Sequence, residues 1–148
     1  MSGIEIKKVT SQMLSDIASI EKECFSSPWS EKSLEILLGD NAVGFAAFCG
    51  EQLVGYVGMM SVLDEGQITN VAVSQSFRRM GCARALLSSL EEYSRENGIV
   101  FLSLEVRNSN SAARELYLSD GWIEAGVRKN FYSLPSEDAI VMTKALEK

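Results

Sequence analysis

The spacing of hydrophobic and polar positions predicts strands and helices that follow one another along the whole chain. In some segments apolar residues recur at every second position, as in a half-buried strand, and in others at helical spacing. The predicted strands cover residues 4–9, 42–49, 53–63, 66–73, 99–106, 122–132 and 138–144. The predicted helices cover residues 13–24, 30–39, 82–97 and the segment between 111 and 121. This order indicates an α/β or α+β sheet with both parallel and antiparallel neighbours.

Capping residues, turn residues and one long apolar run refine these predictions. Thr10 or Ser11 can cap the first helix, and Ser30 can cap the second. Gly50 lies at a hairpin signal between two predicted strands. The strand over residues 99–106 is so strongly apolar that we expect both of its faces to be buried.

Composition excludes several classes of chemistry. The 148 residues include no histidine, which removes Ser-His-Asp and Cys-His catalysis and every histidine-ligated metal site. The three cysteines, Cys24, Cys49 and Cys82, are widely spaced, so we expect reduced thiols and no zinc site. The chain has neither a repeat nor a linker, which predicts a single domain over residues 1–148.

The charge balance bears on the partners of the protein. Lysine and arginine total 14 against 20 aspartates and glutamates, so the formal net charge is −6. This acidity argues against nucleic acid as the main partner and suits a cationic one. No apolar run approaches the ~20 residues of a membrane span, and the first residues do not resemble a signal peptide. We therefore expect a cytoplasmic protein with no metal, no direct nucleic acid contact and no membrane contact.

The junction between the strand over residues 66–73 and the following helix is suited to binding phosphate. It contains the run Arg78-Arg79-Met80-Gly81-Cys82-Ala83-Arg84. Small residues at a helix N-terminus expose backbone N–H groups that can hold a pyrophosphate, and arginines add charge-assisted donors. The run is neither a P-loop nor a Rossmann motif, and taken alone it fits a turn with solvated arginines equally well.

Two motifs, in order along the chain, resemble those of the GNAT superfamily of N-acetyltransferases. They are Arg78-x-x-Gly81-x-Ala83 and Asn110-x-x-Ala113-x-x-Leu116-Tyr117-x-x-x-Gly121-Trp122. The resemblance implies the GNAT fold, a central mixed twisted sheet of about seven strands flanked by about four helices. It also implies acetyl-CoA as the co-substrate and direct transfer without an acyl-enzyme intermediate. Ala83 and Trp122 depart from the commoner glycine and phenylalanine.

Further segments are similar to the bacterial ribosomal-protein-alanine N-acetyltransferases within that superfamily. These segments are residues 28–32, 62–65, 104–110, 128–132 and 137–142. The similarity implies acetylation of the N-terminal alanine of a basic partner, the eighteenth small-subunit ribosomal protein. Two rival functions stay open: acetylation of lysine side chains or small-molecule amines, and a catalytically silent acyl-CoA-binding subunit.

The resemblance also implies roles for individual residues. Glu105 is the implied proton acceptor, and Tyr117 is the implied proton donor to the departing CoA thiolate. The implied cofactor-binding residues are Val71, Ala72, Val73, Arg78, Arg79, Met80, Gly81, Cys82, Ala83, Arg84 and Asn110. The implied substrate-binding residues are Trp29, Phe131 and Tyr132.

Several of these residues also have a purely structural interpretation. Glu105 can be a rim carboxylate paired with Arg107 or Arg128, and Tyr117 can be a core-facing aromatic on an amphipathic helix. Asn110 lies where a helix N-cap is expected. Only the family motif favours a catalytic role for Tyr117 over a packing role.

Overall fold

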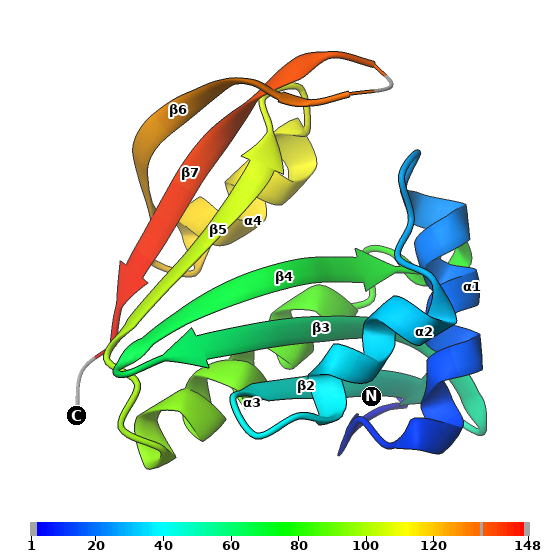
Figure 1. The fold of residues 1–148 in the computed structure, drawn as a ribbon. Coiled ribbons are helices and arrows are strands. Elements are labelled where there is room, and N and C mark those ends of the chain that lie inside the picture. The colour runs from blue at the N-terminus through cyan, green and yellow to red at the C-terminus, as the bar shows by residue number, and fades with distance from the viewer. Residues whose placement is uncertain (1–2, 134, 147–148) are drawn as a thin grey trace.

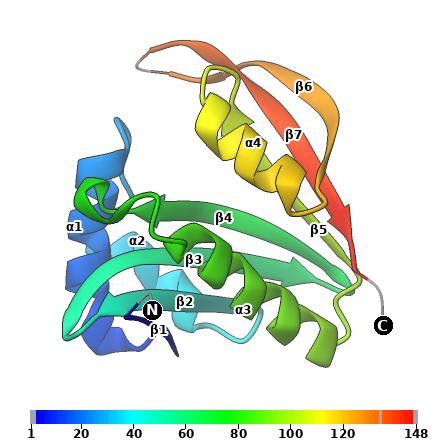
Figure 2. The same cartoon turned by 180° about the vertical axis from the view of Figure 1, so that it is seen from behind.

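One seven-stranded sheet carries helices on both of its faces in the computed structural model, which describes residues 3–133 and 135–146 (Figures 1 and 2). The strands are β1 (Ile4–Lys8), β2 (Ala42–Cys49), β3 (Gln52–Val62), β4 (Glu65–Val73), β5 (Phe101–Arg107), β6 (Ile123–Tyr132) and β7 (Glu137–Ala145). The α-helices are α1 (Leu14–Cys24), α2 (Glu31–Leu34), α3 (Cys82–Glu96) and α4 (Ser111–Ser119). Short 3-10 turns cover Ser11–Met13, Glu35–Leu38 and Gln75–Phe77.

The sheet mixes parallel and antiparallel pairs, as the order of the elements predicts. Its strands follow the order β1-β2-β3-β4-β5-β7-β6. Neighbours in this order run antiparallel, except that β4 and β5 are parallel and are connected through α3. The mixed sheet of seven strands with four α-helices confirms the fold that the family resemblance implies.

β4 and β5 pair only at their first residues and then diverge (Figure 1). Gln67 opposite Ser103 is the last pair of this ladder in the described part of the chain. Just beyond, the register between β3 and β4 shifts and leaves Thr69 as a bulge, which bends a strand. Gly58 makes room for the bulge, because a Cβ there would lie 2.6 Å from Oγ1 of Thr69. The bend coincides with the point where a gap opens between β4 and β5.

Two layers of helices bury the two faces of the sheet. α3 and α4 cover one face, where Leu86 and Leu90 of α3 pack in a cluster with Leu104 of β5 (Figure 2). α1 and α2 cover the other face, where Ile17 and Leu34 pack in a second cluster (Figure 1). No helix among the described residues is both long enough and apolar enough to cross a membrane.

Two sequence predictions about single elements are wrong. The strand over residues 99–106 is not buried on both faces, because Ser103 and Glu105, which alternate with the buried Leu102, Leu104 and Val106, are only half-buried. Neither Thr10 nor Ser11 caps the first helix through its side chain, since that helix begins with a 3-10 turn. By contrast, Ser30 caps α2 as predicted, with Oγ accepting from the Ser33 amide at 3.1 Å.

Candidate active site

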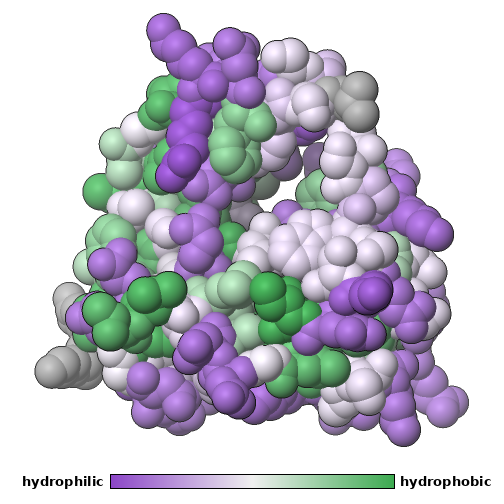
Figure 3. All heavy atoms as spheres, viewed as in Figure 1, coloured by the Kyte–Doolittle hydropathy of each residue, from purple (hydrophilic) through white to green (hydrophobic). Residues whose placement is uncertain are grey.

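A cavity of about 510 Å³ lies where β4 and β5 diverge. The space-filling view shows an opening in the surface on the side from which Figure 1 is also seen (Figure 3). The segment after α1, the second halves of β4 and β5, helix α4 and the end of β6 all contribute lining residues. Among the lining residues are Trp29, Val71, Glu105, Asn110, Tyr117, Phe131 and Tyr132. The fold thus brings together predicted site residues that are far apart in the sequence.

The edge of β4 that faces the gap offers unpaired backbone amides. The Ser74 amide donates to the Val54 carbonyl at 2.7 Å, so it points toward β3. Successive amides of a strand point to opposite edges, which directs those of Val71 and Val73 into the gap and that of Ala72 toward β3. Two of the three predicted amides therefore face the space between β4 and β5.

The loop before α3 presents an open backbone at the helix N-terminus. Gly81 is the N-cap at φ +83°, and nothing lies within 4 Å of the position that a Cβ would take. Arg79 also has a positive φ of 65°. Cys82 points the other way, since it is buried and its thiol lies 3.7 Å from the Phe77 carbonyl. Met80 is exposed and Ala83 is partly buried against the core.

The three arginines of this loop have different partners. Arg78 donates through Nε to the Val73 carbonyl at 3.1 Å, and its Nη2 lies 3.5 Å from the sulfur of Cys24. Arg84 donates to Oγ of Ser119 at 2.8 Å. Arg79 makes no hydrogen bond or ion pair with the rest of the described chain. Of these three arginines, Arg79 is therefore the one that could meet an anion without giving up a contact within the described chain.

Glu105 is held by two neighbours at the edge of the cavity. Nε2 of Gln67 donates to its Oε1 at 2.9 Å, and Nε of Arg128 lies 3.3 Å from its Oε2. The Glu105 side chain is 15% exposed, whereas that of Arg128 is 59% exposed. The ion pair considered from the sequence thus forms with Arg128, while Arg107 pairs with Glu137 instead.

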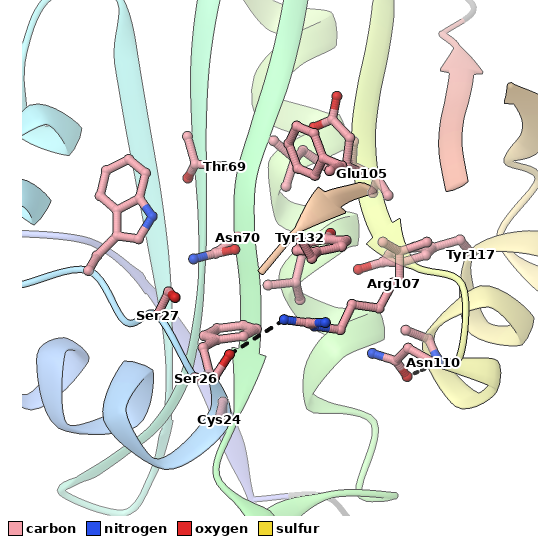
Figure 4. A pocket seen from close by; sticks show the side chains of 18 of the residues that line it. Cys24, Ser26, Ser27, Thr69, Asn70, Glu105, Arg107, Asn110, Tyr117 and Tyr132 are labelled. Carbon is pink, nitrogen blue, oxygen red and sulfur yellow. Dashed lines mark hydrogen bonds between the residues drawn. The ribbon is translucent and has the colours of Figure 1, made fainter. Parts of the chain in front are cut away.

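Tyr117 is buried, yet its hydroxyl points toward the middle of the cavity (Figure 4). Its ring packs against Trp122 with 5.7 Å between centroids. The hydroxyl has no hydrogen-bond partner among the described residues, and burial raises the pKa of the Tyr117 phenol above its usual range. The packing role and the catalytic role are therefore compatible, because the ring fills the core while the oxygen meets the cavity.

Glu105 and Tyr117 lie on opposite sides of β5. Leu104 and Val106 point into the cluster that also contains Tyr117, so the intervening Glu105 points to the other face. Both side chains nevertheless line the same cavity, because the cavity passes through the gap between β4 and β5. The gap can therefore receive one reactant from each face of the sheet.

Asn110 and the aromatic residues complete the lining. Oδ1 of Asn110 accepts from the Ala113 amide at 3.2 Å, which confirms the predicted N-cap of α4. Its Nδ2 has no partner in the described part of the chain. Phe131 and Tyr132 meet edge to face at 5.1 Å, and burial, with Glu105 nearby, raises the pKa of Tyr132 to about 12.

Arg107 is a lining residue that the sequence reasoning missed. It reaches across the cavity toward Ser26, at 3.4 Å, and stacks on the ring of Tyr132 with 4.4 Å to the centroid (Figure 4). It also donates to the carbonyls of Ser133 and Pro135. Its position two residues after Glu105 was a usable signal, because alternation places both side chains on one face of the strand.

Glu21 is a second residue that the sequence reasoning missed. Its carboxylate is fully buried and accepts from the Trp29 amide at 2.8 Å, the Tyr56 hydroxyl at 2.5 Å and Nδ2 of Asn70 at 2.7 Å. It follows Ile17 by four positions, so helical spacing already placed it on the buried face. Glu21 therefore fixes Trp29, at the end of the segment between α1 and α2, and Asn70, a lining residue of β4.

The described residues contain no group of three or more histidine, cysteine, aspartate or glutamate side chains arranged to hold a metal ion.

The fold and the comparison with known protein families give the class of the protein. Residues 14–122 match the family model described as the acetyltransferase (GNAT) family, which covers well over half of the chain. The chain therefore belongs to the GNAT family and is an N-acetyltransferase.

Several similar proteins have a more specific activity within this family. The chain is 38% identical over 125 residues to the ribosomal protein bS18-alanine N-acetyltransferase of Escherichia coli strain K12, covering 83% of this chain and 84% of that protein. A crystal structure of the Escherichia coli ribosomal-protein-alanine N-acetyltransferase superposes with a TM-score of 0.91 and 33% identity, over 98% of this chain and 95% of that one. The PaiA N-acetyltransferase of Thermoplasma acidophilum, solved with coenzyme A, shares the fold with a TM-score of 0.81 and 16% identity, over 96% and 98% of the two chains.

Proposed function

We propose that the protein is an acetyl-CoA-dependent N-terminal acetyltransferase that acts on the α-amino group of an N-terminal alanine of a ribosomal protein. The observation that carries the proposal is the placement of Glu105 and Tyr117 on opposite sides of β5, both lining one cavity. The relative at 38% identity is a ribosomal protein bS18-alanine N-acetyltransferase, which supports alanine of a ribosomal protein as the acceptor. Action on such a substrate would take place in the cytoplasm.

The residues around the gap fit acetyl-CoA. The amides of Val71 and Val73 face the gap, and the open N-terminus of α3 at Gly81, with Arg79 beside it, suits a pyrophosphate. Nδ2 of Asn110, which has no partner among the described residues, can donate to the part of acetyl-CoA that links the thioester to the pyrophosphate. When bound, acetyl-CoA supplies the acetyl group as a thioester. The two strand amides polarise its carbonyl, and losing one such donor typically costs ~10²–10³ in rate.

Glu105 accepts the proton that the acceptor amine must lose. An α-amino group with a pKa of about 7.7–8.0 is already neutral in roughly one molecule in ten at pH 7, whereas a lysine at about 10.4 is almost wholly charged. A single half-buried carboxylate at the cavity edge is therefore sufficient to remove the proton from an N-terminal amine. A lysine acceptor would need a stronger base.

Tyr117 donates a proton to the departing thiolate. Its phenol is protonated at neutral pH, since burial raises a pKa that is ordinarily already near 10. The hydroxyl can therefore donate to the sulfur as thiolate charge develops. Its lack of a partner among the described residues leaves the hydrogen free to point at the sulfur. A general acid of this kind typically contributes ~10²–10⁴ in rate.

The transfer is direct because neither nearby thiol suits an acyl-enzyme. Cys82 is buried and turned away from the loop. Cys24 lines the cavity, but burial raises the pKa of its thiol, and the thiol donates to the Val73 carbonyl at 3.4 Å. A neutral thiol is a poor nucleophile.

The N-terminal segment of the substrate protein enters the cavity from the face of the sheet that α1 and α2 cover. Trp29 and the pair Phe131 and Tyr132 lie on two sides of the cavity, and Arg107 spans between them to Ser26. Long-range attraction would speed the arrival of a basic chain at a protein of net charge −6.

Mapping the acetylated atom in a matched peptide pair tests the proposal. The purified chain and acetyl-CoA are incubated with a peptide that begins with alanine and contains one lysine, and with the same peptide carrying a blocked N-terminus. Mass spectrometry is expected to find one acetyl group on the α-amine of the free peptide and none on the blocked one. Acetylation of the lysine in both peptides would replace the proposal with a lysine acetyltransferase. No turnover on any amine, with intact acetyl-CoA binding, would favour a silent acyl-CoA-binding subunit.

A further inference from the structure

We propose that Gln67 is a positioning residue that holds the Glu105 carboxylate in place, and that Ser103 orients Gln67. The inference rests on the proposed function of Glu105 as the proton acceptor. Gln67 and Ser103 belong to neither sequence motif, and no role in the site follows from the pattern of the chain alone.

The three side chains meet at the point where the sheet opens. Gln67 and Ser103 form the last β4–β5 pair among the described residues, and Glu105 follows Ser103 by two positions on the same face of β5. Oγ of Ser103 donates to Oε1 of Gln67 at 3.1 Å, and Nε2 of Gln67 donates to Oε1 of Glu105 at 2.9 Å. A continuous chain of hydrogen bonds therefore runs from the paired part of the sheet to the carboxylate.

The chemistry of the groups fixes the direction of this chain. An ionised carboxylate only accepts hydrogen bonds, so the amide of Gln67 must present its nitrogen to Glu105. Its oxygen then faces Ser103, whose hydroxyl must donate. The serine thus selects one of the two orientations that the glutamine amide could take, which is the orientation that supports the carboxylate.

The two oxygens of Glu105 have partners of different kinds. Oε1 accepts a hydrogen bond from the neutral amide of Gln67, a residue held in the β4–β5 ladder. Oε2 contacts the guanidinium of Arg128, whose side chain is 59% exposed. The amide restrains the carboxylate without adding charge. The exposed guanidinium on the edge strand β6 can be displaced by the ammonium group of an acceptor, because both are cations with N–H donors. Gln67 therefore holds Oε1 while Oε2 exchanges Arg128 for the amine.

A double-mutant cycle with Glu105 tests this role. The variants are Gln67→Leu, Glu105→Gln and the combination, assayed by steady-state acetylation of an alanine peptide, with Gln52→Leu as a control at another exposed strand glutamine. We expect Gln67→Leu to lower kcat by ~10–100-fold, because small misplacements of a catalytic group have effects of this size. The KM for acetyl-CoA and the melting temperature should match those of the Gln52→Leu control.

The combination separates positioning from general structural damage. If Gln67 acts through Glu105, adding Gln67→Leu to Glu105→Gln should change kcat by less than about two-fold. Ser103→Ala should lower kcat in the same direction as Gln67→Leu but by less, since the amide remains. An equal loss from Gln67→Leu in both backgrounds, or no loss in either, would overturn the role of Gln67. A parental rate in Glu105→Gln itself would instead overturn the proton-acceptor assignment on which the role depends.

Discussion

At the scale of single residues, Tyr117 shows how one side chain serves both the core and the reaction. Its ring packs against Trp122, and its hydroxyl reaches the cavity without a partner in the described chain. The contribution of the hydroxyl to stability is therefore small, whereas its proposed contribution to turnover is large. These two contributions can be measured separately.

The substitution Tyr117→Phe is expected to leave folding almost unchanged and to slow acetylation by ~10²–10⁴. Phenylalanine keeps the ring, and the hydroxyl makes no hydrogen bond within the described structure whose loss would lower the free energy of unfolding. Acetyl-CoA affinity should also stay near that of the parent, because the hydroxyl acts mainly when charge develops on the sulfur. Single-turnover acetylation measured beside thermal melting checks both expectations.

The matched control is Tyr93→Phe, which changes a half-buried tyrosine of α3 that packs edge to face on Phe45. It should melt and acetylate like the parent. If Tyr117→Phe also acetylates like the parent, Tyr117 is a packing residue and the thiolate leaves with its proton taken from water.

Residues such as Glu105 and Tyr117 could be predicted because each stands in a recognisable motif or interrupts an apolar pattern. The partners of these residues could be predicted only in part. Arg128 was one of two candidate ion-pair partners of Glu105, and the choice between them depended on the structure. Gln67 contacts Glu105 from a strand that is distant in sequence, so this contact depends on register. Glu21 could have been found from helical spacing, but its three partners could not.

At the scale of elements, the two ends of α3 offer a controlled comparison. Gly81 at its start and Gly98 just past its end both have positive φ, and a Cβ at either position would meet nothing within 4 Å. The backbone strain of a substitution, roughly 1–2 kcal/mol, should therefore be similar at the two ends. Only the N-terminal end faces the proposed phosphate site.

We expect Gly81→Glu to weaken the binding of coenzyme A at least ~10-fold, because it adds bulk and negative charge beside the N–H groups. Gly98→Glu should be destabilised by a similar amount and should bind coenzyme A with the parental affinity. Isothermal titration calorimetry on both folded variants measures the difference. Equal affinities of the two variants for coenzyme A would contradict the assignment of the pyrophosphate site to the start of α3.

The order and approximate bounds of most elements could be predicted from periodicity, but the gap between β4 and β5 could not. The helix predicted over residues 30–39 is only the four-residue α2 followed by the 3-10 turn Glu35–Leu38. Periodicity records which face a residue presents and contains no information about where two strands stop pairing. The gap begins beside the bulge at Thr69, which Gly58 accommodates across the neighbouring strand. The strand over residues 99–106 was predicted to be buried on both faces, but Ser103 and Glu105 on one face are only half-buried.

At the scale of the whole molecule, a buried charge cluster ties the second half of the fold together. Lys144 of β7 contacts Glu91 of α3 at 2.9 Å, and it also contacts the carboxylate and the carbonyl oxygen of Asp120, which follows α4. Burial, reinforced by Asp120, raises the pKa of Glu91 from 4.5 to about 7, and Lys144 only partly opposes this shift. Oε2 of Glu91 has no partner within the described structure.

This raised pKa predicts the sign of a pH dependence. A carboxyl whose pKa is higher in the folded state stabilises the fold below the unfolded pKa, and the contribution is lost as pH rises through the folded value. Between pH 5 and pH 8 the free energy of unfolding of the parent should therefore fall by roughly 1–3 kcal/mol relative to Glu91→Gln, which cannot ionise. Urea unfolding at the two pH values measures this.

The control for the pH dependence is Glu92→Gln, at the exposed neighbouring position of the same helix. Its free energy of unfolding should follow that of the parent at both pH values. Parallel curves for the parent and Glu91→Gln would show instead that Glu91 is ionised across the whole range.

The pH dependence of Glu105→Gln tests most directly whether Glu105 is the proton acceptor at the edge of the gap. Single-turnover acetylation of an alanine peptide is measured from pH 6 to pH 10 for the parent and the variant. We expect the variant to be slower by ~10²–10⁴ at neutral pH and to recover only part of this loss, about ten-fold, as the amine, with its pKa of about 7.7–8.0, loses its proton unaided. A variant that matches the parent in rate and in pH profile would contradict the account and leave Glu105 as the ion-pair partner of Arg128.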